Sequence, residues 1–538
     1  MAQEKKSVAH KQGFLQGAAI LTIGTLASRV VGALFKIPLT RLITTQGAGH
    51  FNVAYNIYTV LLNVSSTGLP IAVSRMVSEA ATLGRRRQVQ KIRRISLWLF
   101  VLIGLLCGGA MLIFAPQLAT WMRDPDAWYA IAVLAPAVLF VCISSSFRGY
   151  FQGQQYMTPT AVTQVLEAFC KLFLGLGAIL LALRAGWNYA QATGAAIVGV
   201  TIGAALGSGY LALQYRKKRL RLTPEDAASP VLSTWETTRR LLTLAIPITI
   251  GATGLQVFNA LGSKVILGRL QDALGYPLSE ASSLYGVFSM AQTLYLLPSA
   301  LVQPLAISII PAVTSALALS KLEDARRLEE SSFRIAGLIA LPCGLGMSVL
   351  SVPIQRALYG YDPQTLETAG PVLALLGIAA VLYCFILVTN AILQAHGKAT
   401  TLIYTTLAGG IANLAVSYLL VGSSRFHIHG AAIGTVVYCV VTLALNLLAI
   451  GRYLSKAPRL LPQVMKSLLA ACVMGAAAFL TDYLLHSLVL AIGAAVLTYL
   501  ACVYCLKILT WYDCQLLPKG DTIARLLRVW SQDSPNSL

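Results

Sequence analysis

Five ionisable residues lie inside long apolar stretches, where a charge is costly unless it meets a partner or a water-filled cavity. They are Arg29, Lys36, Glu167, Lys171 and Lys264. Glu167 and Lys171 are four residues apart, so one helical face would carry both, and we expect a mutually neutralising ion pair. The other three are cations without a matching carboxylate. This pattern predicts a cationic site within an apolar region.

A cationic site predicts an anionic ligand. Arginine donates two parallel hydrogen bonds to a phosphate, whereas lysine supplies a point charge. Near Lys264, Gln256 and Asn259 would add neutral hydrogen-bond donors. Two other interpretations stay open at this stage: Lys36 could extend its ammonium to the membrane surface, and Arg29 could bind a carbonyl or a lipid headgroup.

The elements that would position these residues are transmembrane helices. The chain has 538 residues, 57% hydrophobic and 11% charged, whereas about 25% of the residues of a soluble protein are charged. Apolar runs of about twenty residues suffice to cross a bilayer. The sequence therefore predicts an all-α polytopic membrane protein with about fourteen transmembrane helices, near 15–40, 52–74, 95–117, 128–148, 159–183, 190–214, 241–268, 284–310, 334–355, 369–394, 400–421, 428–451, 466–485 and 487–508.

The basic residues predict how the chain is oriented and divided. Most of the 41 Lys and Arg residues fall in alternate loops, which places both termini in the cytoplasm of a bacterial cell. The polar connection 216–240 is predicted to be a cytoplasmic linker. It would join a six-helix lobe (1–215) to a second six-helix lobe (241–453), followed by two further helices (454–510) and a cytoplasmic tail (511–538).

Short internal repeats favour this division. The segment Ser28-Arg29-Val30 recurs as Ser263-Lys264-Val265, and Pro70-Ile71-Ala72-Val73-Ser74 recurs as Pro304-Leu305-Ala306-Ile307-Ser308 at nearly the same separation. Two parallel repeats of this kind are a common transporter plan. Pseudosymmetric lobes would then bring Arg29 and Lys264 face to face across a central cleft.

Several function classes find no support in the sequence. The net charge of +21 is spread over short loops, so it indicates membrane orientation and not nucleic-acid binding. No metal-ligand or nucleophile motif is present, which predicts no enzyme, no metal and no cofactor. The acidic residues of the predicted outer loops are isolated along the chain: Asp124, Asp126, Asp272 and Asp362. Gly199, Gly203 and Gly207 recur at four-residue spacing and predict a close helix contact.

Longer segments resemble a known family. They are SRVVGALFKIPLTRLI, GAGHFNVAYNIY and STGLPIAVSRMVSEAA near the start, then FRGYFQGQQYMTPTAVTQVLEAFCKL and LYLLPSALVQPLAISIIPAVTSA. Together they resemble the stage V sporulation protein B and lipid II flippase branch of the multidrug/oligosaccharidyl-lipid/polysaccharide exporter superfamily. The resemblance implies two lobes that rock around a central cavity and carry undecaprenyl-pyrophosphate-linked sugars outward.

The resemblance also implies residue roles. The cavity arginine of the family corresponds to Arg29, and a second basic position has Lys36, displaced by one residue. Arg75 and Glu79 match a motif at the cytoplasmic gate, although an exposed ion pair at a helix end explains them equally well. The expected partners are a lipid-linked anionic glycan, membrane lipids and the cell-wall synthesis machinery.

Two other functions stay open. A cation-coupled multidrug exporter of the same superfamily would need an unpaired carboxylate within the membrane. A membrane glycosyltransferase or a scaffold without transport would leave the intramembrane cations unexplained. The identity of the glycan and a role in growth or in sporulation are not predicted by the residues.

Overall fold

The computed structural model describes residues 14–66, 68–218, 231–454, 457–510 and 513; within α1 and α8 some side chains also lie outside the described part. The described residues are helical or in short connections, and they contain no strand. The all-α prediction is confirmed. Contacts divide the chain into two units, Met1–Ser289 and Met290–Leu538, which are described separately below.

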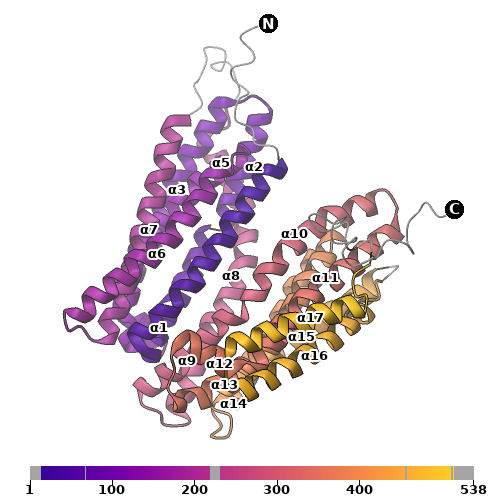
Figure 1. The fold of residues 1–538 in the computed structure, drawn as a ribbon. Coiled ribbons are helices and arrows are strands. Elements are labelled where there is room, and N and C mark those ends of the chain that lie inside the picture. The colour runs from indigo at the N-terminus through magenta and orange to yellow at the C-terminus, as the bar shows by residue number, and fades with distance from the viewer. Residues whose placement is uncertain (1–13, 67, 219–230, 455–456, 511–512, 514–538) are drawn as a thin grey trace, which may run out of the picture. The chain divides into compact units, whose positions relative to one another are not determined.

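The first unit contains the helices coloured from indigo to pink in Figure 1. They are α1 (Phe14–Ser66), α2 (Gly68–Thr82), α3 (Arg86–Ile113), α4 (Ala115–Trp121), the 3₁₀ turn η2 (Pro125–Ala127), α5 (Trp128–Gly153), α6 (Thr158–Arg184), α7 (Tyr189–Lys218), α8 (Thr234–Asp272) and the greater part of α9 (Leu278–Tyr295). Helix α5 packs against α1, α2, α3 and α7, so it forms the centre of the unit.

Helix α1 is two helical segments, 14–43 and 45–66, that meet at Thr44. The backbone of Thr44 has φ 62° and ψ 178°, a region that is otherwise almost restricted to glycine. Pro38 lies six residues before this break and removes one helical hydrogen bond. The break lets residues 45–66 follow a different course from the first segment.

Small residues bring α6 and α7 together, as the sequence predicts. A Cβ added at Gly199 would overlap the backbone of Gly175, and one at Gly207 would approach the Glu167 carboxylate. Cys170 blocks the same addition at Gly203. The two helices therefore pack backbone to backbone (Figure 1), which fixes the position of Glu167 and its neighbours on α6.

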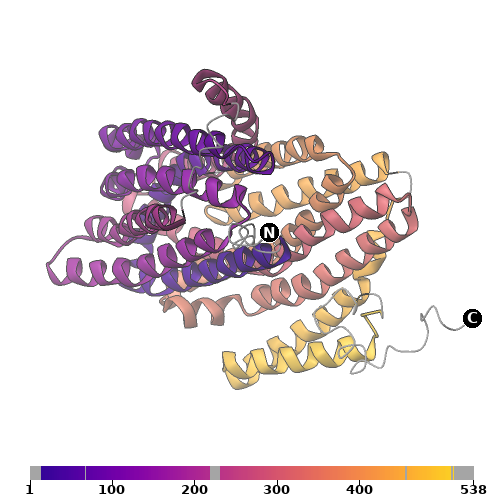
Figure 2. The ribbon, with the colours of Figure 1, turned by 90° about the horizontal axis from the view of Figure 1, so that it is seen from above.

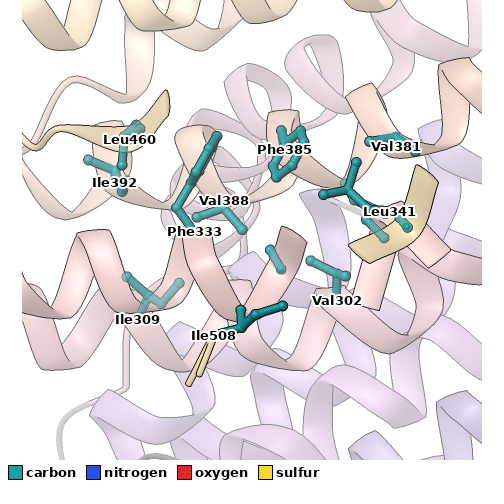
Figure 3. Packing of buried hydrophobic residues seen from close by; sticks show 14 of the residues in the cluster. Val302, Ile309, Phe333, Leu341, Val381, Phe385, Val388, Ile392, Leu460 and Ile508 are labelled. Carbon is teal, nitrogen blue, oxygen red and sulfur yellow. The ribbon is translucent and has the colours of Figure 1, made fainter. Parts of the chain in front are cut away.

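The second unit is built around an apolar core. Its helices are α10 (Leu297–Ala318), α11 (Leu322–Val349), α12 (Ser351–Tyr359), α13 (Pro363–Ala395), α14 (Ala399–Val421), α15 (His429–Tyr453), α16 (Leu460–Leu485) and α17 (Leu488–Cys505). In this core the rings of Phe333 and Phe385 stack with centroids 4.5 Å apart (Figure 3). Val388, Ile392 and Leu460 complete the packing around them.

The last two helices, α16 and α17, lie side by side in both ribbon views (Figure 1 and Figure 2). Helix α16 also packs against α11. There the guanidinium of Arg334 donates to Gln463 at 2.6 Å and to Asp513 at 2.6 Å. This cluster fixes the two ends of the α16–α17 pair to α11.

Twelve described segments are long and apolar enough to cross a membrane. One of them, Ile23–Thr82, contains the break at Thr44, and another, Leu278–Ala318, covers both α9 and α10. The prediction of a multi-pass membrane protein with about fourteen spans is confirmed in its class and in its approximate count.

Candidate functional site

The ammonium of Lys171 lies in an aromatic cage formed by α1. Its Nζ is 5.1 Å from the ring centroid of Phe35, 5.5 Å from that of Phe51 and 4.6 Å from that of Tyr55. Phe51 and Tyr55 stack on each other with centroids 5.6 Å apart. The faces of aromatic rings attract a cation but do not neutralise its charge.

The carboxylate of Glu167 has a different partner from the predicted one. Its Oε1 accepts a hydrogen bond of 2.6 Å from the Arg148 guanidinium of α5. The predicted pairing of Glu167 with Lys171 is therefore wrong. Helices α5 and α6 both pack against α7 and α1, so a charge on α5 comes closer to Glu167 than the ammonium one turn away on its own helix. Guanidinium also suits carboxylate geometry better than ammonium does.

Lys36 lies on the same side of α1 as the cage. Its half-buried ammonium donates to the Asn52 carboxamide oxygen at 3.2 Å, and it is close enough to Lys171 for the two charges to repel each other. Asn52 in turn donates to the Ser289 hydroxyl at 2.9 Å. The break at Thr44 makes this contact possible, because it folds residues 45–66 back toward Lys36.

Hydrogen bonds between neutral side chains lie next to the Lys36–Asn52–Ser289 contacts. Asn56 donates to the Ser263 hydroxyl at 2.6 Å and to the Tyr285 hydroxyl at 2.8 Å. Tyr285 donates to Ser263 at 2.8 Å. Helices α1, α8 and α9 thus share buried and partly buried polar groups that hydrogen-bond to one another. Together with Lys171 of α6 we call them the polar seam: Lys36, Asn52, Asn56, Lys171, Ser263, Tyr285 and Ser289.

The predicted partners on α8 lie apart from the lysines of the seam. The Lys264 ammonium lies 3.9 Å from the ring centroid of Trp121, at the end of α4. The side chains of Asn259 and Gln256 are bonded to each other at 3.3 Å. Ser263 is the residue of this helix that joins the seam, because it is buried while Asn259 is exposed.

Three further predicted positions lie on α1 and α2. Arg29 lies in α1, but its side chain is outside the described part of the structure. At the end of α2, Glu79 pairs with Arg240 of α8 at 3.1 Å. Arg75, one turn before Glu79, is exposed. The structure therefore pairs Glu79 with a residue of a distant segment.

Sequence reasoning missed several members of the site. Arg148 stands at the end of a predicted span, and the aromatic residues of the cage resemble ordinary core residues. Two of the four acids that are isolated in sequence are paired in space: Asp124 with His50 at 2.7 Å and Asp272 with Arg123 at 2.8 Å. An early signal was available for Asn52 and Asn56, since two amides four residues apart in an apolar span form one polar face.

No group of three or more histidine, cysteine or acidic residues suited to a metal ion occurs among the described residues. Nor do the described pairs include two facing carboxylates. The chemistry that the seam offers is recognition: ammonium groups, amides and hydroxyls that can donate to the oxygens of an anion.

Comparisons with known proteins show the family to which the chain belongs. The family described as polysaccharide biosynthesis protein matches residues 14–317. Stage V sporulation protein B of Bacillus subtilis (strain 168) is 26% identical over 449 residues, with 82% of this chain and 85% of that protein covered. Lipid II flippase MurJ of the same organism is 24% identical over 485 residues, with coverages of 88% and 89%.

Solved structures show the same fold. Lipid II flippase MurJ in an inward closed conformation is similar with a TM-score of 0.70 at 14% identity, covering 91% of this chain and 98% of that one. A multidrug resistance MATE family transporter of the MOP superfamily, in an inward-facing conformation, gives a TM-score of 0.64 at 16% identity, covering 81% and 100%. The chain is thus a multi-pass membrane protein that belongs to the polysaccharide biosynthesis protein family and has the fold of MOP-superfamily transporters.

Proposed function

We propose that this protein is a flippase that moves a lipid-linked, diphosphate-bearing precursor of the cell wall or of a related polysaccharide across the bacterial membrane. The polar seam would meet the anionic diphosphate, and the two lobes would alternate between inward and outward access. The names of the relatives support this class of cargo, since one is a lipid II flippase and another a sporulation protein.

The observation that carries the proposal is the partner of Glu167. Arg148 neutralises this carboxylate, so the described residues give the nearby Lys171 aromatic faces as partners and no carboxylate. Because Lys36 lies beside it, two positive charges share one region of the seam. Holding them at membrane depth is costly, and an anionic cargo would repay that cost each time it binds.

Arg29 extends the same proposal. It lies seven residues before Lys36, so two helical turns place both on one face of α1. Guanidinium binds phosphate through two parallel hydrogen bonds. Lys264 would act at a later stage of transport, because its ammonium lies on Trp121 in the present conformation. The proposed cytoplasmic gate includes Arg75 and the Glu79–Arg240 pair, which joins α2 to α8.

A cation-coupled multidrug exporter is the competing function. Such a protein needs an intramembrane carboxylate that can bind sodium or a proton. Glu167 already holds a guanidinium at 2.6 Å, and the similarity to the multidrug resistance MATE family transporter is one of fold alone. The described charges therefore favour an anionic cargo.

The test is outward movement of lipid II by the purified protein in liposomes, detected with an external enzyme that modifies the exposed headgroup. We expect Lys171→Met to lower the initial rate by about tenfold or more, the equivalent of about 1.4 kcal/mol of lost interaction. Arg29→Ala should have an effect of similar size. Lys218→Met is the matched control, because the Lys218 ammonium also lies over a ring, that of Tyr156 at 3.9 Å, but at the end of α7.

The outcomes separate the alternatives. Equal rates for wild type, Lys171→Met and Arg29→Ala would remove the cationic seam from the mechanism. If wild type moves a cationic dye but no lipid-linked diphosphate, the exporter is correct. If it moves a different undecaprenyl-diphosphate glycan in place of lipid II, with the same loss in Lys171→Met, the class is correct and the glycan is identified.

A further inference from the structure

A buried histidine–aspartate pair lies outside the site described above. His50 belongs to the second segment of α1, and Asp124 to the connection between α4 and η2. Their side chains are 1% and 0% exposed. The His50 Nδ1 lies 2.7 Å and 2.8 Å from the two carboxylate oxygens of Asp124. Both titratable groups are thus shielded from water and hydrogen-bonded to each other.

The backbone next to this pair is strained. Arg123 has φ 64°, a conformation that is unfavourable for a residue with a side chain. As a consequence, consecutive residues reach different helices: Arg123 donates to Asp272 of α8 at 2.8 Å, while Asp124 contacts His50 of α1. Gln271 adds a hydrogen bond of 2.7 Å to the Arg123 carbonyl. We call these contacts of Arg123 and Asp124 the α4–η2 tie.

The other charges at this end do not set the charge of the pair. Arg123 and Asp272 neutralise each other and are about half exposed. The Lys264 ammonium of α8 lies over Trp121, and Asp126 of η2 and Glu280 of α9 are exposed. Tyr285 of α9 interacts electrostatically with Asp124. The neutral hydroxyl of Thr193 on α7 donates a hydrogen bond to the Gly47 carbonyl.

We propose that His50 and Asp124 form a proton-binding site that keeps the α4–η2 tie closed. With one proton on the pair, an imidazolium faces a carboxylate and the net charge is zero. When the proton leaves to water, a carboxylate with no counter-charge remains in a site without solvent. Burial of a lone charge is strongly unfavourable, so Asp124 moves toward water and the strained backbone at Arg123 relaxes. The tie then no longer joins this end of α8 to α1.

This role does not depend on what the protein carries. It requires that the tie opens when the pair loses its proton as the pH rises. Hydrogen–deuterium exchange of residues 119–127, measured by mass spectrometry in nanodiscs and corrected for the pH dependence of chemical exchange, reports that opening directly.

Four proteins make the test decisive. Wild type should protect residues 119–127 at about pH 5 and lose at least about tenfold of that protection by about pH 8. His50→Gln leaves the Asp124 carboxylate without its cation, so the segment should be more open than wild type at about pH 8. The double variant His50→Gln/Asp124→Asn keeps a hydrogen bond between neutral amides and should be closed at every pH. Asp272→Asn should keep the pH dependence of wild type.

Protection of wild type that is constant over this range would overturn the proposal. So would a pH dependence that survives in the double variant, because the proton would then bind elsewhere. If His50→Gln does not fold, the double variant still decides the question, since it has no uncompensated charge.

Discussion

The interiors of the two units differ in the kind of polar group that they bury. In the first unit, the polar seam contains the ammonium groups of Lys36 and Lys171. In the second, the polar group between α13 and α15 is the amide of Asn446, which donates to Thr389 at 3.1 Å and to Asn390 at 2.8 Å. The amide of the second unit thus joins two of its helices, whereas the first unit holds two ammonium groups in its seam.

In both units, however, each of these carboxylates has a basic side chain as its partner. In the second unit Glu329 bonds to His396 at 2.7 Å and Asp513 to Arg334 at 2.6 Å; in the first, Glu167 bonds to Arg148. Acids are therefore compensated throughout the described chain wherever they are buried. In the first unit, the described partners of Lys171 are aromatic rings and not a carboxylate, which is the reason we propose that this unit meets the anionic cargo.

The largest effect on stability should come from the apolar core of the second unit. Phe333→Ala removes a ring that is 1% exposed and stacked on Phe385, and we expect a loss of about 4 kcal/mol in unfolding free energy. Phe173→Ala in the first unit is the control, because Phe173 is 65% exposed. Denaturation in the same detergent measures both, and equal losses would contradict this account of the core.

A slightly smaller effect should follow from breaking the compensated acid of the first unit. Arg148→Ala leaves the Glu167 carboxylate partly buried without a cation, which we expect to cost about 3 kcal/mol. The double variant Arg148→Met/Glu167→Met should recover most of that loss, because neither charge then needs a partner. If the double variant is as unstable as Arg148→Ala, the pair contributes packing and not charge compensation.

A moderate effect tests the close approach of α9 to the second segment of α1. A Cβ on Gly286 would overlap the Thr45 carbonyl, next to the short hydrogen bond between Thr45 and Ser283. Gly286→Val should destabilise the protein by about 2 kcal/mol. At Gly209 nothing lies within 4 Å of an added Cβ, so Gly209→Ala should be neutral or stabilise by up to about 1 kcal/mol. Thermal unfolding of the two variants separates them.

The smallest loss of stability should come from removing a helix cap, and the two units offer one cap each for comparison. Asp362 accepts from the Thr365 backbone N–H at 3.0 Å and from its hydroxyl at 2.7 Å, and these bonds lower the pKa of the Asp362 carboxyl below its ordinary value of 3.8. The folded pKa is thus the lower one, so the capping contribution is complete above pH 3.8 and is lost as the pH falls through the folded pKa. Asp362→Ala should cost about 1 kcal/mol at neutral pH and less in acid.

In the first unit, Ser233 caps α8 through a hydrogen bond of 3.1 Å to the Glu236 N–H. Ser233→Ala should cost a similar amount, about 1 kcal/mol, but its effect should not change with pH, because a serine hydroxyl does not titrate in this range. A pH-independent loss in Asp362→Ala would mean that its carboxylate charge is unimportant to the cap.

Much of the architecture could be predicted from local sequence. Apolar runs set the class and the approximate number of membrane helices, because a bilayer demands about twenty apolar residues per span. The spacing of Gly199, Gly203 and Gly207 predicted that α7 makes a close contact with another helix, and the structure shows that this helix is α6. The predicted spans 15–40 and 52–74 implied an interruption between them, but the conformation of Thr44 was not predicted. Nothing in the sequence Leu42-Ile43-Thr44-Thr45 marks a conformation that usually requires glycine.

The sequence by itself determined which residues carry charge into the membrane, because their types and the apolar runs around them are local properties. The tertiary structure alone decided how those charges pair. Arg148 reaches Glu167 from another helix, and Lys171 is left to three aromatic rings. His50 meets an aspartate 74 positions away. The physical reason is that Coulomb energy depends on distance in space, and helix packing brings together residues that spacing along the chain keeps apart.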